Sequence, residues 1–352
     1  MRELRICDEG RGWQTEGMLP SLDELLGSAR VVSLPLVTRF RGIDTREALL
    51  LEGPRGWTEF SPFVEYDDAE AAAWLRAAID FGWREAPQTL RESVSVNATV
   101  PAVRPDAVAR VLARFPGCLT AKVKVAGVDQ TLTDDVTRVR AVRDVLGPEG
   151  RIRVDANGLW NVDEAEHAIH TLAEFDLEYV EQPCASIEEL VEIRERTKYM
   201  GVPIAADESV RKTDDPLAVA RAGAADILVI KAAPLGGIRA ALLIVRQAGL
   251  PVVVSSALDT SIGLSMGAHL AAAVPGLQFD CGLGTASLLA ADVTAKPLLP
   301  ENGAIPVRRV TPDAVLLDRH AASVDRRDWW LARLARTYAL VAHPPRNRSC
   351  GR

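Results

Sequence analysis

Residues 151–156 read RIRVDA and residues 178–183 read EYVEQP, two short apolar segments that each carry an acidic residue near their end. Three further segments have the same form: TAKVKV at 120–125, PIAADES at 203–209 and DILVIKA at 226–232. Intervals of 31, 26, 26 and 24 positions separate the charged residues Lys124, Asp155, Glu181, Asp207 and Lys231. One strand, one helix and two loops fill such an interval, so a repeated βα unit with a charged group at each strand end is predicted.

Three more β-type segments extend the series to eight predicted strands, SVNATV at 95–100, VVVSSA at 252–257 and QFDCGLG at 278–284. Amphipathic helical patterns lie between the strands, and two of them open with residues typical of capping boxes, Asn161 with Glu164 and Ser186 with Glu189. Strands that alternate with helices form parallel sheets, and eight in series predict a closed barrel. The predicted fold class is α/β, with the barrel over residues 93–285.

Strand alternation places the charged residues on one side of the sheet. If Lys122 and Lys124 point into the barrel, Val123 points toward the helices, and the same register holds for Asp155 and for Glu181. Ionised groups inside a protein are costly unless they are paired, shifted in pKa or bound to a metal. Three carboxylates at one rim of a barrel therefore predict a bound cation.

The remaining chain lacks this repeat. Residues 1–92 predict a separate α+β domain, which we expect part of residues 286–340 to complete, and residues 341–352 are predicted to form a mobile tail.

Bulk composition limits the classes of function. A chain that is 48% hydrophobic and 25% charged is an ordinary globular protein, and its net charge of −7 argues against a nucleic-acid surface. No apolar run is long enough to cross a bilayer and the first residues lack a signal-peptide core, so we expect a cytoplasmic protein without a membrane partner. The 5 cysteines form no CxxC pair and are expected to be reduced. The oligomeric state is left open, a monomer included.

The sequence resembles the enolase superfamily, of the muconate-cycloisomerase type, in the motifs AKVKVAG, RVDANG, YVEQP, AADES and IKAAPLGG. The resemblance implies a (β/α)7β modified TIM barrel beneath an N-terminal α+β capping domain. It also implies that Asp155, Glu181 and Asp207 hold Mg²⁺, a hard cation that takes oxygen ligands. No histidine is needed, and His167 and His170 are expected on a solvated helix face.

The same resemblance implies that Lys124 is a general base and that Lys231 faces it across the pocket. Enolase-superfamily sites are a known example of pKa tuning, in which a lysine or histidine base works beside Mg²⁺. Lys122 and the metal would both disfavour the proton on Lys124. With Mg²⁺, the three lysines exceed the three carboxylates by two positive charges, which suits a small-molecule dicarboxylate substrate.

Three further segments, FRGIDTRE with GWTEFSPF, VVVSSALDTSIGL and CGLGT, resemble the o-succinylbenzoate synthase group within the superfamily. That group dehydrates 2-succinyl-6-hydroxy-2,4-cyclohexadiene-1-carboxylate in menaquinone biosynthesis. The group has glycine where this chain has Thr58. The resemblance implies substrate contacts from Lys122, Asn157, Ser255, Ser256, Leu283, Gly284, Arg41, Phe60 and Ser61.

Two alternatives remain open at this level. Opposed lysines also suit an N-acylamino acid racemase or a dipeptide epimerase, although the latter typically has a DxD-like pair on the eighth strand. This chain has Asp280 but Gly282 two positions later. A non-catalytic metal-binding barrel is the second alternative, because a fold alone does not imply an activity.

Overall fold

A computed structural model describes residues 19–212 and 215–343 of the chain. At its centre lies a seven-stranded parallel sheet in the order β11-β10-β9-β8-β7-β6-β5. The strands are β5 (Ala98–Val100), β6 (Thr120–Lys124), β7 (Arg151–Asp155), β8 (Leu177–Glu181), β9 (Ile204–Ala206), β10 (Ile227–Ile230) and β11 (Val252–Val254).

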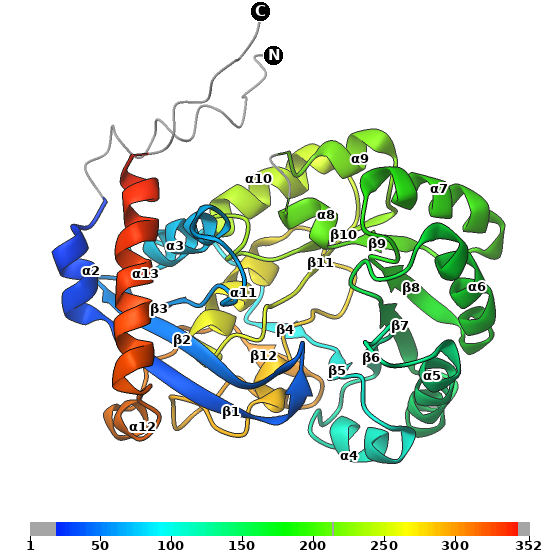
Figure 1. The fold of residues 1–352 in the computed structure, drawn as a ribbon, viewed down its shortest axis with the longest axis horizontal. Coiled ribbons are helices and arrows are strands. Elements are labelled where there is room, and N and C mark those ends of the chain that lie inside the picture. Colours follow the sequence, from blue (N-terminus) through cyan, green and yellow to red (C-terminus); the bar gives the residue numbers. More distant parts are fainter. Residues whose placement is uncertain (1–18, 213–214, 344–352) are drawn as a thin grey trace, which may run out of the picture.

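Two isolated bridges join the edges of this sheet. Cys281 pairs in parallel with Val96, just before β5, and Gly282 pairs in parallel with Ser255, just after β11. The eighth predicted strand is therefore a short segment that closes the barrel. Figure 1 shows the strands curling around with helices on their outer face, as predicted from the βα repeat.

Helices follow the barrel strands along the chain, and local sequence explains where two of them begin. Both predicted capping boxes are confirmed, Asn161 with Glu164 at the start of α6 and Ser186 with Glu189 at the start of α7. The barrel helices are α4 (Val108–Leu112), α5 (Leu132–Leu146), α6 (Val162–Leu172), α7 (Ile187–Thr197), α8 (Glu208–Arg211), α9 (Ala218–Ala222), α10 (Ile238–Ala248) and α11 (Ser261–Ala273). Short 3-10 turns are η2 (Pro105–Ala107), η3 (Ala173–Phe175), η4 (Lys198–Met200) and η5 (Thr285–Leu288).

The predicted strand alternation is confirmed by the two hydrophobic clusters of the barrel. Val123, Val154 and Leu228 belong to the large cluster between the sheet and the helices. Tyr179 and Val229 belong to a separate small cluster inside the barrel. Each is one position away from a residue that faces the helices. The charged residues therefore share the interior side of their strands with this small cluster.

An antiparallel sheet of β1 (Arg30–Phe40), β2 (Ile43–Gly53) and β3 (Gly56–Phe60) lies beside the barrel and is packed by α2 (Leu22–Ser28) and α3 (Asp68–Trp83). Chain from beyond the barrel returns to this region, because the last helix, α13, packs along α3 (Figure 1). The later elements are α12 (Ala314–Arg319), α13 (Val324–Ala342) and β12 (Ala304–Pro306), which pairs with β4 (Ser93–Ser95).

The proposed domain limits stay a prediction. Val341 and Ala342, assigned above to a mobile tail, end helix α13. The rest of that tail, residues 344–352, and residues 1–18 of the first domain lie outside the described residues. Within the described ranges, no helix combines the length and apolar character needed to span a bilayer. Cys118, Cys184 and Cys281 are free and buried, whereas Cys7 and Cys350 lie outside the described residues.

Candidate active site

Five charged residues meet at the carboxyl ends of five neighbouring strands. Lys124, Asp155 and Glu181 are the last residues of β6, β7 and β8, and they stand level with one another in the strand register. Asp207 and Lys231 directly follow β9 and β10. The carboxyl ends of barrel strands form the face where enzymes of this architecture act. The three predicted carboxylates and both lysines are thus brought together as expected.

A narrow cavity lies over this face, with a volume of about 40 Å³. Pockets that enclose small-molecule ligands run to roughly 300–1,000 Å³, so the cavity is smaller here than such pockets usually are. The barrel and the capping sheet both contribute to the wall. Its residues are Phe40, Arg41, Phe63, Thr99, Lys122, Lys124, Asn157, Asp207, Glu208, Arg211, Lys231, Ser255, Ser256, Ala257, Leu258, Gly282 and Thr285.

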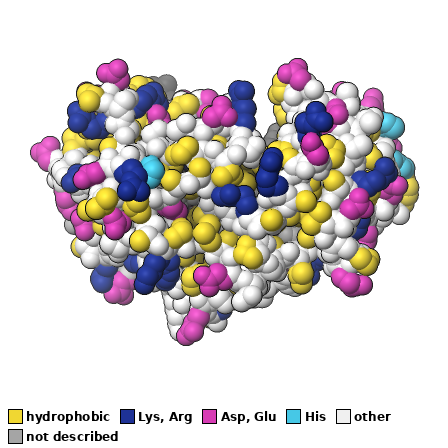
Figure 2. Space-filling model, turned by 90° about the horizontal axis from the view of Figure 1, so that it is seen from below, with side chains coloured by type: hydrophobic (Ala, Val, Ile, Leu, Met, Phe, Trp, Pro, Cys, Tyr) yellow, Lys and Arg dark blue, Asp and Glu magenta, His cyan; other side chains and the backbone are white. Residues whose placement is uncertain are grey.

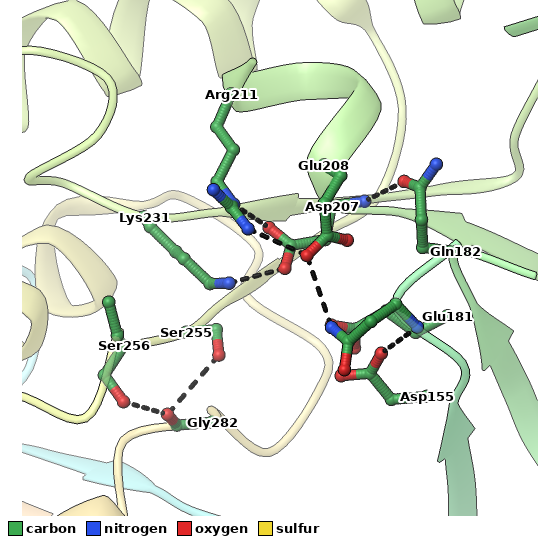
Figure 3. A network of polar contacts seen from close by, with 12 residues as sticks. Asp155, Glu181, Gln182, Asp207, Glu208, Arg211, Lys231, Ser255, Ser256 and Gly282 are labelled. Carbon is green, nitrogen blue, oxygen red and sulfur yellow. Dashed lines mark hydrogen bonds and ion pairs between the residues drawn. The ribbon is translucent and has the colours of Figure 1, made fainter. Parts of the chain in front are cut away.

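Each carboxylate of the cluster contacts a lysine. The Lys122 Nζ lies 2.9 Å from an oxygen of Glu181 and 3.2 Å from one of Asp155. Lys124 donates to Asp155 Oδ2 at 2.5 Å, and Lys231 donates to Asp207. Figure 3 shows the Lys231 pair, with Arg211 on the other side of Asp207. Among the described residues, no three His, Cys, Asp or Glu side chains are placed to share one metal ion.

Burial and mutual charge displace several pKa values in this cluster. Burial, followed by the charge of Asp155, raises the pKa of Glu181 to about 7. Burial acts in the same direction on Asp155, but Lys124 and Lys122 outweigh it and hold the Asp155 pKa well below its usual range. Burial lowers the pKa of Lys124, and the neighbouring Lys122 adds to this effect against Asp155. Opposite shifts in adjacent groups are typical of sites that transfer protons.

Asn157 connects the cluster to the next loop. Its backbone has φ of 50°, and its Oδ1 accepts a hydrogen bond of 2.8 Å from Lys124. Its Nδ2 donates to Glu208 Oε1 at 3.2 Å. Arg211 donates to Asp207, to Glu208 and to the Tyr66 hydroxyl of the capping domain. Glu208 and Arg211 were not identified from the sequence as site residues; they are the first and last residues of the short helix α8, which follows β9.

Four of the predicted substrate contacts do not line this cavity. Phe60 is fully buried against Trp330, with 6.0 Å between ring centroids, because it points into the capping core. Ser61 is buried and bonds Glu59 and Arg46 instead. Phe63, which follows Ser61 in the loop after β3, and Leu258 line the cavity instead of Phe60 and Ser61.

Leu283 and Gly284 are the other two predicted substrate contacts that do not line the cavity. Leu283 is fully buried and packs on Gly267 of α11. Gly284 lies close under the backbone of Asn97, where a side chain would collide with its carbonyl. Gly282 and Thr285 face the cavity on either side of them.

The predicted residues Arg41, Lys122, Asn157, Ser255 and Ser256 do line the cavity. Ser256 donates to the Gly282 carbonyl at 2.7 Å and contacts the Thr285 hydroxyl at 2.8 Å. Figure 3 shows Ser255 and Ser256 turned toward Gly282.

Thr99 of β5 also lines the cavity, and its buried hydroxyl has no hydrogen-bond partner in the described structure. Thr99 was not predicted from the sequence. The strand alternation that turns Lys122 into the barrel also turns Thr99 inward, because the two are partners in the register of neighbouring strands.

Two family models match the chain. The model described as "Enolase C-terminal domain-like" covers residues 106–313, and "Enolase N-terminal domain-like" covers residues 31–82. A curated relative from Mycobacterium ulcerans, o-succinylbenzoate synthase, is 52% identical over 322 residues, 91% of this chain and 96% of that protein. The o-succinylbenzoate synthase of Mycolicibacterium smegmatis is 52% identical over 92% of this chain and 99% of its own length.

Solved structures show the same fold at lower identity. Muconate lactonizing enzyme from Pseudomonas putida matches with a TM-score of 0.70 and 20% identity over 84% of this chain and 98% of that one. The L-Ala-D/L-Glu epimerase from Bacillus subtilis matches with a TM-score of 0.68 and 22% identity over 81% of this chain and 96% of that one.

Proposed function

The chain belongs to the o-succinylbenzoate synthase family of the enolase superfamily, and from this premise we propose how its cavity performs that reaction. Its activity is that of a carbon–oxygen lyase. We assign as substrate 2-succinyl-6-hydroxy-2,4-cyclohexadiene-1-carboxylate, which loses water to become o-succinylbenzoate in menaquinone biosynthesis.

One observation carries the mechanistic proposal: Lys124 and Lys231 line one cavity from strands β6 and β10. The three strands between them end in the three carboxylates. This arrangement supports roles for Lys124 as the base and for Lys231 as a cation that faces it across a substrate in the cavity. A non-catalytic barrel has no need for two such lysines.

The carboxylates fit a divalent metal by their chemistry. Asp155, Glu181 and Asp207 are at most 1% exposed, and the pKa of Glu181 is raised first by its burial and then by the charge of Asp155. Oxygen-only donors favour a hard cation, and we assign Mg²⁺. A bound Mg²⁺ supplies positive charge that stabilises the negative charge formed on the substrate carboxylate when its α-proton is lost. Binding requires Lys122, Lys124 and Lys231 to release the carboxylate oxygens that they contact here.

Lys124 performs the proton transfers in this proposal. Its lowered pKa increases the neutral fraction, which can take the proton from C1 of the ring. The electron pair of that C–H bond is first held as the enolate of the substrate carboxylate, and it then forms the C1–C6 double bond as the C6–O bond breaks. Lys124 returns the proton to the departing hydroxyl on the same face, so water leaves and the ring becomes aromatic. Lys231 stays cationic and stabilises the developing negative charge.

Racemisation of an N-acylamino acid is the alternative that the paired lysines favour, since exchange of an α-proton between two faces needs a base on each. A dipeptide epimerase would in addition need an acidic pair on the eighth strand to bind the substrate amine, and Asp280 does not take that role. It accepts hydrogen bonds from Thr120, the first residue of β6, and from Arg151, the first residue of β7, at the opposite end of the barrel. An amine-binding acidic pair on the eighth strand, as in dipeptide epimerases, is therefore not formed here.

The first test is loss of the diene absorbance when purified protein and Mg²⁺ meet the proposed substrate, with EDTA as control. We expect rapid, metal-dependent loss with o-succinylbenzoate as product. No reaction would contradict the assignment and make N-succinyl amino acids the next substrates. Exchange of deuterium from D₂O into an unreactive acylamino acid separates the mechanisms, because exchange at both faces requires two working bases.

A further inference from the structure

Three buried charged residues join the capping sheet to the barrel next to the cavity. Arg46 of β2, Glu59 of β3 and Asp259 of the loop between β11 and α11 are 2%, 3% and 9% exposed. Loss of hydration makes such burial costly unless the groups are paired and hydrogen-bonded. None of the three belongs to the carboxylate cluster or to the lysine pair, so their role lies outside the chemistry proposed above.

Arg46 contacts two walls of the cavity at once. Its Nε donates to the Leu258 carbonyl at 3.1 Å, and its Nη2 donates to the Ala257 carbonyl at 3.4 Å. Its guanidinium also lies over the Phe63 ring, 4.5 Å from the centroid. Ala257, Leu258 and Phe63 all line the cavity. A single capping-domain side chain therefore supports wall residues from both domains.

Glu59 holds the start of helix α11. Its Oε2 accepts hydrogen bonds from the backbone N–H groups of Thr260 and Gly263 at 3.1 and 3.0 Å and from the Thr260 hydroxyl at 2.6 Å. A negative charge at a helix N-terminus is stabilising. Gly263 leaves the necessary room, since a Cβ there would lie 2.8 Å from Glu59 Oε2.

The loop held in this way has a strained backbone. Leu258 has φ of 62°, a left-handed conformation that costs a non-glycine residue of order 1–3 kcal/mol and persists only when neighbours impose it. Those neighbours are Arg46, on the Leu258 carbonyl, and Asp259, whose Oδ2 accepts the Ala257 N–H at 3.1 Å. Without these contacts the wall formed by Ala257 and Leu258 has an easier conformation available.

We propose that Arg46 is a positioning residue for substrate binding, which with Glu59 clamps the wall formed by Ala257 and Leu258. The clamp acts through the loop and contributes no reacting group. It sets the fit of the cavity around the part of the substrate that lies away from the carboxylate cluster. The identity of that substrate rests on the proposed function, whereas the clamp is a property of the described structure itself.

The test compares Arg46→Met with Arg326→Met at pH 8. Arg326 is the matched control, because it pairs with Glu47, the neighbour of Arg46 on β2, and contacts no residue of the loop. For Arg46→Met we expect KM to rise at least tenfold and kcat to fall less than threefold, with Mg²⁺ affinity unchanged by calorimetry. Arg326→Met should stay within twofold in every parameter. Arg46→Lys should restore binding only in part, since one ammonium cannot reproduce a planar fork of donors.

Stability and positioning are separated by a second variant. The charges of Glu59 and Asp259 act on the Arg46 guanidinium. Arg46→Met therefore leaves two buried acids without this cation and should lower Tm. Arg46→Met/Glu59→Gln removes one of those charges, so Tm should recover toward wild type while KM stays raised. A KM within twofold of wild type in Arg46→Met, or a KM that recovers together with Tm, overturns the proposal.

Hydrogen exchange tests the clamp without turnover. A peptide covering residues 255–264 should exchange faster in Arg46→Met than in wild type, and not faster in Arg326→Met. Wild-type protein that neither dehydrates the diene nor binds o-succinylbenzoate would remove the proposed function. Hydrogen exchange still tests the clamp in that case. Unchanged protection of residues 255–264 in Arg46→Met overturns the clamp, and lost protection supports it.

Discussion

The two ends of the barrel interior both hold buried charges, but they hold them differently. Strand β7 contributes to each, with Arg153 toward the amino end and Asp155 at the carboxyl end. Arg153 donates to Asn97 Oδ1 at 3.0 Å and to the Asp280 carbonyl at 2.7 Å, and it lies over the Tyr179 ring. At the carboxyl end, lysines face acids beside a cavity. On the face seen in Figure 2, Lys and Arg side chains are interspersed with Asp and Glu side chains among hydrophobic and other residues.

Residue type explains the difference between the two ends. Arginine has a rigid fork of donors and keeps its proton, so the amino-end cluster is a fixed structural element. Lysine carries a compact ammonium whose pKa shifts readily on burial, and here the pKa of Lys124 is lowered while that of Glu181 rises to about 7. Buried charge alone therefore does not mark a reactive site. Lysine and acidic side chains that lie together beside a cavity do indicate a reactive site.

The largest effect is expected at the carboxyl end. Lys124→Ala should reduce turnover by about 10³-fold or more, because general acid–base catalysis contributes typically 10²–10⁴-fold and this residue acts twice. Steady-state kinetics measure the loss, and calorimetry with Mg²⁺ checks that the metal still binds. Lys198→Ala is the control, since Lys198 is an exposed lysine paired with Glu195. Activity within tenfold of wild type would refute the base assignment.

At the amino end the same comparison predicts a loss of stability without a loss of chemistry. Arg153→Met should lower the free energy of unfolding by about 1–3 kcal/mol, because the buried Asn97 Oδ1 and the Asp280 carbonyl lose their charged donor. Glu178, which is 18% exposed, keeps only Arg151 as its cation. Denaturant titration measures the loss of free energy, and kcat of the folded protein should change less than threefold. Arg151→Met is the matched control, since Arg151 is 51% exposed and pairs with Glu178 and Asp280. An exposed pair is worth roughly 0–1 kcal/mol.

Asp207→Asn should weaken Mg²⁺ binding by at least roughly 10–100-fold, since an amide replaces a charged oxygen donor and the loss of a residue that only supports a metal ligand already costs that much. Titration calorimetry gives the affinity directly. Asp280→Asn, at the other end of the barrel, should leave it unchanged. Equal Mg²⁺ affinity in Asp207→Asn and wild type would mean that the carboxylates are not the metal ligands.

The stability of the metal-free protein is expected to depend on pH. Glu181 has a folded-state pKa of about 7 against an ordinary value of 4.5, so the folded state holds a proton that the unfolded state has lost between these values. Its contribution to stability is therefore fully present below pH 4.5 and is lost as pH rises through 7. Metal-free protein should lose about 2–3 kcal/mol of unfolding free energy between pH 5 and 8, and Glu181→Gln should lose less. An identical pH dependence in both proteins contradicts the shift.

The barrel could be predicted because its signals are local. The intervals between Lys124, Asp155 and Glu181 reflect the length of a βα unit, and a two-residue alternation decides which side chains face inward. Capping boxes act over three residues and were correct in α6 and α7. These patterns also placed the five charged residues on one rim, since parallel strands end at the same edge.

The capping side of the site could not be read in this way. Phe60 and Phe63 are three positions apart, yet one packs on Trp330 of α13 and the other lines the cavity. Nothing in the segment GWTEFSPF distinguishes them, because the choice depends on a helix that follows some 270 residues later.

The sequence by itself determined the barrel, the order of its strands and the identity of the charged rim, since these follow from periodicity along a short stretch of chain. Only the tertiary structure decided that Arg46 and Glu59 support a loop more than 200 positions away, and that Lys122 lies between Asp155 and Glu181. Contacts of this kind depend on how two separately folded surfaces meet. Their energies come from burial and from exact side-chain placement, neither of which leaves a periodic trace in the residues.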